Sequence, residues 1–350
     1  MYKLPLKTDF NNIEILKLLS DANNRVGELK GTLNLLPNPK ILLNAITLGE
    51  AKASSELENI VTTYDELYKE MTSEVSISSS AKEVLRYRKA ISLGFEELKT
   101  NGFISSKSLV NIQNCIEENK GGIRKLPGTV IKNTKTGEIV HTPPQSEQEI
   151  HEYLTNLENY INHNNEYDPL INMGIIHYQF ETIHPFYDGN GRTGRILNVL
   201  YLVMKEKLSY PILYLSKYII ENKNEYYSLL RECNENESSV IDFVSYMLNG
   251  VIYTTDFTIR FIFEIINSIN STADMMKEKL PQIYSKELVE YLYYEFYTKN
   301  EFLRNELNIA RSTATRYLKQ LEEQGFLIGE KVGKEVIYKN VAMFDLMDKW

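Results

Sequence analysis

The sequence predicts a mainly α-helical protein with a small β-hairpin near its middle and a winged helix-turn-helix domain at its C-terminus. Three observations support this fold class. Apolar residues recur at steps of three and four over most of the chain. Residues 128–144 instead place β-branched residues on both sides of a polar turn and end in two prolines. Residues 281–350 read as three helices, of which the first spans residues 284–300, followed by a strand, a turn and a strand.

Length and composition place the chain among ordinary globular proteins. At about 100–200 residues per domain, 350 residues suggest two or three domains. A net charge of −8 argues weakly against general nucleic-acid binding. The two cysteines, Cys115 and Cys233, have no metal-site or disulfide-framework spacing, which fits a reducing compartment. No secretory leader or membrane-length apolar run is present, so we expect a cytoplasmic protein without membrane contact.

Four regions follow from the patterning. We expect an N-terminal helical region over residues 1–78, a core over 79–250, a linking helix over 251–280 and the winged helix over 281–350. The first helix shows a stripe of apolar residues, namely Ile13, Leu16, Leu19, Ala22, Val26 and Leu29. A second amphipathic helix is expected from Ser80 to Thr100. Asp168 followed by Pro169 predicts a capped helix start in the core.

The stretch "HPFYDGNGRTG", residues 184–194, lies between two helical patterns and opens the second helix. It contains G-x-G-x-x-G, but no strand precedes it and no acid follows at the spacing of a dinucleotide-binding fold. It also comes close to a P-loop, yet Arg195 and Ile196 replace the lysine and hydroxyl residue. Both readings fail, although glycines at a helix start still suit an anion.

The residue types in this stretch are those of phosphoryl or nucleotidyl transfer. Asn190 and the backbone of residues 189–191 are suited to holding a phosphate, and Asp188 to holding a divalent cation. Arg192 and Arg195 share a helix face and can pair with one anion. His184 is the group able to take a proton near neutral pH. The alternative is a plain helix cap, which needs neither the histidine nor the arginine pair.

Residues 184–195 match the H-x-F-x-[DE]-G-N-G-R-x-x-R signature without a departure, and the chain thereby resembles the Fic family over about residues 1–250. The resemblance implies a helical Fic core that transfers AMP from ATP to a protein hydroxyl with Mg2+. It implies His184 as the base, Asp188 as the metal ligand and the remaining motif residues as the nucleotide-binding set: Gly189, Asn190, Gly191, Arg192, Gly194 and Arg195. ATP and a target protein, or the protein itself, would be the partners.

Two further segments gain meaning from this resemblance. The hairpin resembles the flap of the family, which docks a target segment by strand addition, with the docking residues expected at Thr129, Val130, Ile131 and Lys132. Ser54, Glu58 and Asn59 resemble the inhibitory motif [ST]-x-x-x-E-[GN]. Taken without the family, Ser55 and Glu58 read as a capping box at a helix start. As a brake, Glu58 would pair with Arg195; as a water-orienting group it would favour removal of AMP.

The predicted winged helix leaves its own function open. Its second helix carries Arg311, Arg316 and Lys319, which would suit the major groove of DNA. Residues 281–350 contain 10 basic and 11 acidic residues, however, so the composition favours protein docking or homodimer formation over DNA binding. A DNA-binding regulator with a nucleotide-sensing Fic core therefore stands as the alternative function, beside a de-AMPylating hydrolase.

Overall fold

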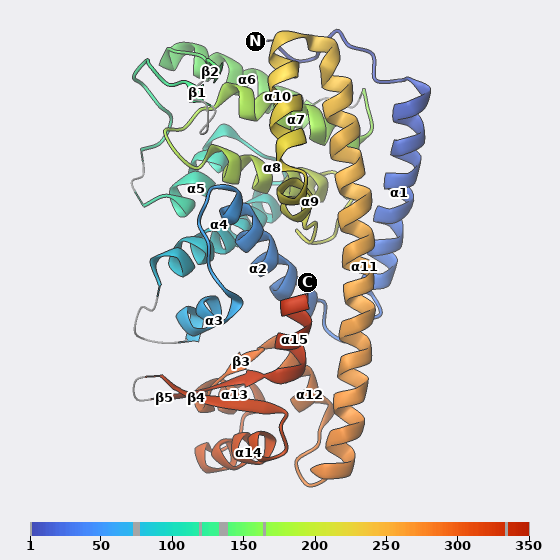
Figure 1. The fold of residues 1–350 in the computed structure, drawn as a ribbon, viewed down its shortest axis with the longest axis vertical. Helices are drawn as coiled ribbons and strands as arrows, with labels where there is room; N and C mark the ends of the chain where they lie inside the picture. Colours follow the sequence, from blue (N-terminus) through green and yellow to red (C-terminus); the bar gives the residue numbers. More distant parts are fainter. Residues whose placement is uncertain are drawn as a thin grey trace.

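The computed structural model describes residues 2–72, 78–118, 121–132, 139–163, 166–332 and 335–349. Helices dominate it, as predicted (Figure 1). The helices up to residue 235 are, in chain order, α1 (Ile13–Leu33), α2 (Pro39–Leu57), α3 (Tyr64–Thr72), α4 (Ser79–Asn101), α5 (Ser106–Ile116), α6 (Glu147–His163), α7 (Pro169–Ile183), α8 (Asn190–Met204), α9 (Leu215–Glu221) and α10 (Lys223–Glu235). A 3₁₀ turn over Glu237–Ser239 then leads into α11 (Val240–Lys279).

Capping residues fix the helices that carry the motif. Asp168 accepts the Leu170 N–H at 2.8 Å and Pro169 is the first helical residue, so α7 starts where the sequence predicts. Both α7 and α8 are buried over nearly their whole length, and they pack against each other. The residues between them are therefore held at both ends by the core.

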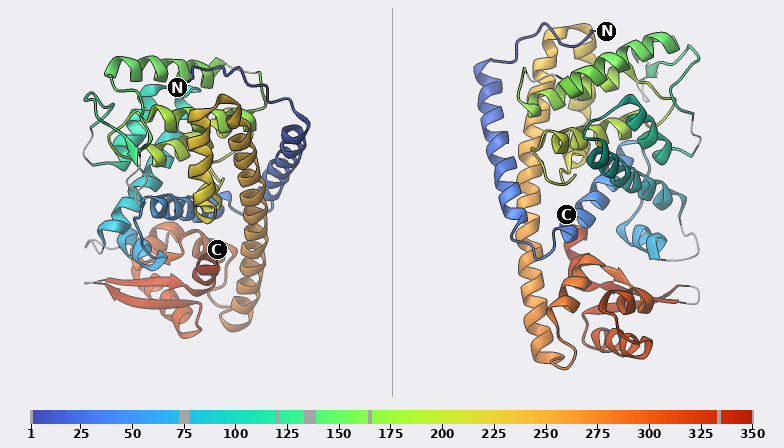
Figure 2. Two further views of the ribbon diagram at one scale, coloured as in Figure 1. Left: turned by 45° about the horizontal axis from the view of Figure 1, so that its top comes forward. Right: turned by 180° about the vertical axis from the view of Figure 1, so that it is seen from behind.

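The apolar stripe predicted for the first helix is partly wrong. The helix forms over the expected residues, but Ile13 and Leu16 are 72% and 45% exposed, and Ile15 is buried instead. From Ala22 onward the predicted face is the buried one, because this half of α1 packs along α11 (Figure 2). The face of the first turns is set by tertiary packing rather than by spacing alone.

The predicted hairpin is present as two short strands, β1 (Ile131–Lys132) and β2 (Ile139–His141). They pair antiparallel, with Ile131 opposite His141 and Lys132 opposite Ile139. Thr129 and Val130 lie in the extended segment just before β1. The polar turn at residues 133–138 lies outside the described residues.

The C-terminal part follows the predicted order of helices and strands and adds two elements. It comprises α12 (Lys286–Tyr294), β3 (Tyr297–Thr298), α13 (Asn300–Leu307), α14 (Arg311–Glu323), β4 (Leu327–Val332), β5 (Glu335–Asn340) and α15 (Val341–Lys349). The predicted helix over 284–300 is too long, because its last part forms β3 in a three-stranded antiparallel sheet of order β3-β5-β4. The closing helix α15 was not expected.

Helix α11 joins the two parts of the chain. It is one 40-residue helix that starts at Val240, so the expected domain boundary at residue 250 falls inside it. Its N-terminal half packs on α1, α7, α9 and α10, and its C-terminal half on α12 and α15 (Figures 1 and 2). A single helix thus supports both the motif-bearing core and the C-terminal part.

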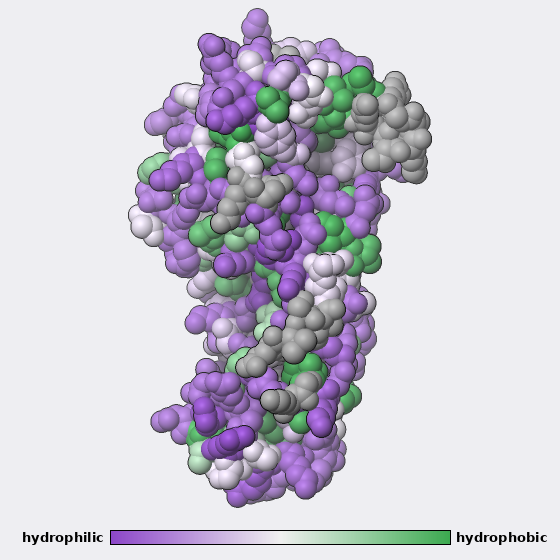
Figure 3. Space-filling model, turned by 90° about the vertical axis from the view of Figure 1, so that its left-hand side faces the viewer, coloured by the Kyte–Doolittle hydropathy of each residue, from purple (hydrophilic) through white to green (hydrophobic). Residues whose placement is uncertain are grey.

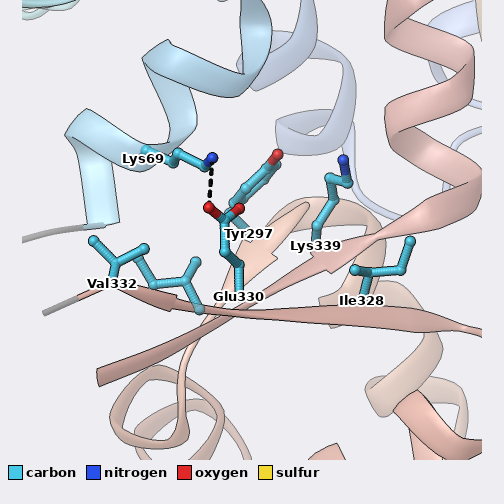
Figure 4. Close-up of a pocket in the computed structure, with 7 residues that line it drawn as sticks. Lys69, Tyr297, Ile328, Glu330, Val332 and Lys339 are labelled. Carbon is cyan, nitrogen blue, oxygen red and sulfur yellow. Dashed lines mark hydrogen bonds and ion pairs between the residues drawn. The ribbon is translucent and has the colours of Figure 1, made fainter. Parts of the chain in front are cut away.

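A second connection runs from α3 to the C-terminal sheet. Lys69 of α3 pairs with Glu330 of β4 at 2.8 Å (Figure 4). The ring of Tyr297 in β3 stacks on Tyr68 with centroids 4.6 Å apart, and its hydroxyl donates to Asp65 at 2.8 Å. Helix α3 follows the predicted inhibitory motif directly, so the C-terminal part contacts the segment that leaves this motif.

The basic residues of α14 lie on its outer face. Arg311 and Arg316 are exposed, and Lys319 pairs with Glu323 one turn away at 3.7 Å. Across the described residues, no helix combines the length and apolar character needed to cross a membrane. The face drawn in Figure 3 is mostly hydrophilic, with separate apolar patches.

Candidate active site

The motif forms a tight loop between the C-terminus of α7 and the N-terminus of α8. Helix α7 ends because His184 adopts a left-handed conformation, with φ 47° and ψ 59°, while its N–H still donates to the Phe180 carbonyl at 3.0 Å. The side chain of Asn190 then closes the loop. Its Oδ1 accepts the Phe186 N–H and its Nδ2 donates to the Phe186 carbonyl, both at 2.8 Å. The loop is therefore a fixed scaffold.

His184 presents a neutral imidazole. Burial lowers its pKa to about 4, so the ring is uncharged at neutral pH. Its Nδ1 is buried and has no hydrogen-bond partner among the described residues. A neutral ring with a free nitrogen is a group that can accept a proton.

The N-terminus of α8 faces the loop without a side-chain cap. Gly189 holds the N-cap position at φ 79°, and the first helical hydrogen bond of the turn runs from the Thr193 N–H to the Gly189 carbonyl. The N–H groups ahead of Thr193 have no intrahelical acceptor, and the helix dipole adds attraction for an anion. The backbone N–H groups of Asn190 and Gly191 thus suit a phosphate, whereas the Gly189 N–H already donates to Asp188 and the Asn190 side chain is used within the loop.

Asp188 lies at the exposed edge of this helix start. One carboxylate oxygen accepts the Gly189 N–H at 2.8 Å. No cluster of three or more histidine, cysteine or acidic side chains suited to a metal occurs in the part of the chain that the structure describes. A single exposed carboxylate next to a phosphate-binding backbone fits Mg2+, which typically takes one or two carboxylates together with substrate phosphates.

Arg192 is held by two acids that no local sequence pattern identifies. Its Nη1 pairs with Glu83 of α4 at 2.8 Å, and its Nη2 with Glu117 at the end of α5 at 2.5 Å. The residue is 3% exposed. The phosphate-binding role expected for Arg192 therefore stays a prediction, and a nucleotide would compete with two carboxylates for this guanidinium.

Arg195 is enclosed by the predicted inhibitory motif. Its Nη2 donates to the Glu58 Oε1 at 2.9 Å, and its Nε donates to the Ser54 Oγ at 2.7 Å. Burial alone would lower the pKa of Arg195, but the Glu58 carboxylate raises it above its usual value. Gly191 makes the approach possible, because a Cβ there would lie 2.7 Å from the Glu58 Oε1. The two distant segments meet as expected.

Glu58 stands at the end of a helix, so the capping-box interpretation of Ser55 and Glu58 is wrong. Asn59 has φ 65°, its N–H donates to the Glu56 carbonyl at 2.9 Å, and the Ile60 N–H donates to the Ser55 carbonyl at 3.0 Å. This pair of bonds is a Schellman motif, which terminates α2. Asparagine and glycine tolerate the left-handed conformation best, which gives a physical reason for the [GN] position.

The hairpin is tied to the helix that carries His184. The ring Nε2 of His141 in β2 hydrogen-bonds with the Thr182 carbonyl at 2.9 Å. Gln145 binds the extended segment just before β1, since its Nε2 donates to the Thr129 carbonyl at 3.0 Å and its Oε1 accepts the Gly128 N–H at 2.7 Å. The expected docking segment, residues 129–132, thereby keeps a fixed position relative to the loop.

Two residues that hold the backbone of the site in place are not predicted from the sequence. Arg124 is fully buried and donates from Nε to the His184 carbonyl at 2.7 Å and from Nη2 to the Ile183 carbonyl at 3.3 Å. Lys223 of α10 donates to the Leu57 carbonyl at 2.8 Å, at the end of α2. Neither stands near a motif residue in sequence, so no local pattern could have identified them.

Comparison with known families agrees with this geometry. Residues 16–96 match the Fic/DOC family N-terminal region, and residues 103–202 match the Fic/DOC family itself. The chain belongs to the Fic/DOC family. Residues 269–343 match a third family, described as the C-terminal domain of SoFic-like protein adenylyltransferases. The Fic motif and its N-terminal brake candidate therefore lie in recognised parts of the family, and so does the C-terminal part.

Individual Fic relatives are distant. A probable protein adenylyltransferase of Aquifex aeolicus is 27% identical over 203 residues, which cover 58% of this chain and 60% of that protein. The protein adenylyltransferase Fic of Culex quinquefasciatus is 27% identical over 139 residues, 39% of this chain and 26% of the relative. The matches thus span less than two thirds of either relative.

Solved structures share the fold. A Fic family protein from Desulfovibrio desulfuricans has a TM-score of 0.61 at 18% identity, covering 94% of this chain and 96% of its own. Fic-1 from C. elegans, residues 134–508, has a TM-score of 0.54 at 21% identity and covers 70% of this chain and 72% of its own. The first of these aligns with the C-terminal part as well as with the Fic core.

Proposed function

We propose that this Fic protein is a protein adenylyltransferase, which transfers AMP from ATP to a Ser, Thr or Tyr hydroxyl of a target protein or of itself. One observation carries the proposal. A neutral His184, the uncapped start of α8 and the Asp188 carboxylate converge on one loop, and Arg195 borders it. The two relatives named above, both protein adenylyltransferases, support the same reaction.

The chemistry follows from the positions of these groups. His184 accepts the proton of the target hydroxyl, whose oxygen forms a bond to the α-phosphorus of ATP. The bond from that phosphorus to the bridging oxygen breaks, and pyrophosphate leaves. The N–H groups at the start of α8 stabilise the negative charge that develops on the phosphate oxygens. Asp188 would hold Mg2+, which when bound neutralises phosphate charge.

Glu58 restrains the reaction in this proposal. Its carboxylate occupies Arg195 together with Ser54, so the guanidinium is not available to the outer phosphates of ATP. Arg195 is 4% exposed, and desolvation strengthens the pair relative to one in water. The brake is therefore a competition between one carboxylate and one phosphate for the same cation.

The decisive experiment incubates the full chain with α-labelled ATP, Mg2+ and a cell lysate. We expect label on protein to rise about tenfold or more in Glu58→Gly relative to wild type, since a charge-assisted bond of about 1.5–3 kcal/mol is removed. His184→Ala in the Glu58→Gly background should abolish labelling. Glu56→Gly is the matched control, because Glu56 precedes the motif glutamate by two residues and pairs with Lys52 instead.

The result also separates the alternatives. Equal labelling by wild type and Glu58→Gly would contradict the brake, and absence of label with either would contradict the transferase. Loss of label from a premodified protein, dependent on Glu58, would instead favour AMP removal. Salt-dependent DNA retention that disappears in Arg311→Ala with Arg316→Ala, without any labelling, would favour the DNA-binding alternative.

A further inference from the structure

A cavity lies at the joint between the Fic core and the C-terminal part. Its volume is about 200 Å3. Its walls come from α2, α3 and α4 on one side and from the segment Tyr294–Phe302 on the other. It shares Tyr297 with the smaller hollow drawn in Figure 4 and is remote in sequence from the 184–195 loop. None of the residues predicted for AMP transfer lines it.

The cavity contains a guanidinium without a carboxylate partner. Arg88 of α4 donates to the Asn44 Oδ1 at 2.9 Å, to the Thr47 Oγ1 at 3.4 Å and to the Met71 Sδ at 3.4 Å. Two of these three bonds are long or use a weak acceptor, and they leave N–H donors on both terminal nitrogens. Within the described chain no acid forms an ion pair with Arg88.

The opposite charge lies on the facing wall. Glu295, between α12 and β3, is half-buried and forms neither an ion pair nor a side-chain hydrogen bond with any described residue. Burial raises the pKa of Glu295, and Arg88 acts against that rise. The two charges thus influence each other across the cavity without meeting. Leaving both unpaired is costly unless a ligand joins them.

Aromatic and apolar groups fill the remaining wall. Tyr68 and Phe296 lie edge to face with centroids 5.1 Å apart, and Tyr297 stacks on Tyr68. Leu48 of α2 and Phe302 of α13 add apolar surface. The Tyr68 hydroxyl is buried and has no hydrogen-bond partner among the described residues. A ligand for this cavity therefore needs an apolar body together with polar groups at one end.

We propose that this cavity binds a free α-amino acid with a large apolar side chain. Its carboxylate would pair with Arg88 and its ammonium with Glu295, and its side chain would lie among the aromatic rings. The volume suits this size, because an apolar cavity of about 150 Å3 holds benzene. The site is independent of AMP transfer, since it shares no residue with the transfer machinery.

The test measures binding of L-phenylalanine to the full chain by calorimetry, beside two analogues that each lack one charge. We expect 3-phenylpropanoate, which lacks the ammonium, and 2-phenylethylamine, which lacks the carboxylate, to bind about tenfold more weakly or worse. Arg88→Met and Glu295→Gln should each weaken L-phenylalanine by a similar factor. Arg86→Met and Glu290→Gln are the controls, because these residues pair with Glu118 and Lys286 instead.

Met71→Trp is a second variant that tests the cavity even if Arg88→Met does not fold. Met71 is 39% exposed at the cavity wall, so a larger ring there should block the cavity without disturbing the core, and L-phenylalanine binding should be lost. A dissociation constant weaker than about 10 mM for both L-phenylalanine and L-leucine overturns the proposal. So does equal binding of 3-phenylpropanoate, or displacement of L-phenylalanine by ATP with Mg2+.

Discussion

Asn59 ends α2 in a left-handed conformation directly after Glu58, whose carboxylate pairs with Arg195. A β-branched residue there pays a conformational cost of about 1–2 kcal/mol, and glycine does not. We expect Asn59→Val to lower the free energy of unfolding by about this amount and to raise labelling with α-labelled ATP, because Glu58 is displaced. Asn59→Gly should behave like wild type in both assays. Identical labelling by the two variants would show that the helix end does not position the brake.

We expect the buried carboxyl of Glu181 to make the stability of the folded chain depend on pH. Burial raises its pKa to about 7, Arg195 opposes the rise and Glu58 adds to it. The carboxyl fills the space beside Gly194, where a Cβ would lie 2.5 Å from its Oε1. Because the unfolded chain titrates near 4.5, the folded state holds the extra proton between about pH 4.5 and 7. The contribution of this group to stability is complete below that window and is lost as pH rises through about 7.

Glu181→Gln removes this titration. We expect the free energy of unfolding of the variant, minus that of wild type, to be larger at about pH 8 than at about pH 5. Urea unfolding of both proteins at both pH values measures this difference. His184, whose pKa is lowered to about 4, contributes in the opposite direction in both proteins and cancels in the comparison. A stability difference between variant and wild type that does not change with pH would refute the assignment.

At the scale of elements, Arg124 joins the segment after α5 to the C-terminus of α7. Its guanidinium donates to the carbonyls of Ile183 and His184, and its own N–H donates to the Pro185 carbonyl at 2.9 Å. Arg124→Met leaves two buried carbonyls without this donor, so we expect a loss of about 2–3 kcal/mol in stability. In the Glu58→Gly background, kcat should fall more than the KM for ATP changes, since His184 loses its position.

The matched control for this prediction is Lys125→Met, because Lys125 is the neighbouring residue and pairs with Glu147 near the surface. Arg124→Lys should restore part of the lost kcat, since it keeps one donor. A variant that lost stability but kept the kcat of its parent would show that Arg124 supports the fold without positioning His184.

The elements also show how far sequence alone reaches. Local spacing and caps predict the helices around the motif, the hairpin and the two C-terminal helices. The motif residues lie together on one loop because they are consecutive in the sequence. Local pattern failed where long-range packing decides. Ser55 and Glu58 read as a helix start but end α2, and Tyr297 read as helical but pairs with Lys339 of β5. Arg124 and Glu117 contact motif residues from segments that are distant in the sequence. A single sequence contains no pattern that predicts such contacts.

At the scale of the whole molecule, the hydrophobic core runs without interruption from α1 through the C-terminal sheet. Helix α11, about 60 Å long at 1.5 Å per residue, supports both parts. The Tyr68–Tyr297 stack closes the other side of the joint. The two parts therefore share buried surface at two separated places, and unfolding one of them exposes apolar groups of the other.

We therefore expect the wild-type chain to unfold in one cooperative transition, with the calorimetric enthalpy equal to the van't Hoff enthalpy. Tyr68→Ala removes the stacked ring and leaves a larger cavity at the joint, at a cost of about 3–5 kcal/mol. In that variant the C-terminal part should melt first, as a separate transition. Lys69→Met, in the same helix, removes only the partly exposed pairs with Asp65 and Glu330 and should shift stability by about 1 kcal/mol or less, still in one transition. Two transitions in the wild type would mean that α11 does not couple the parts.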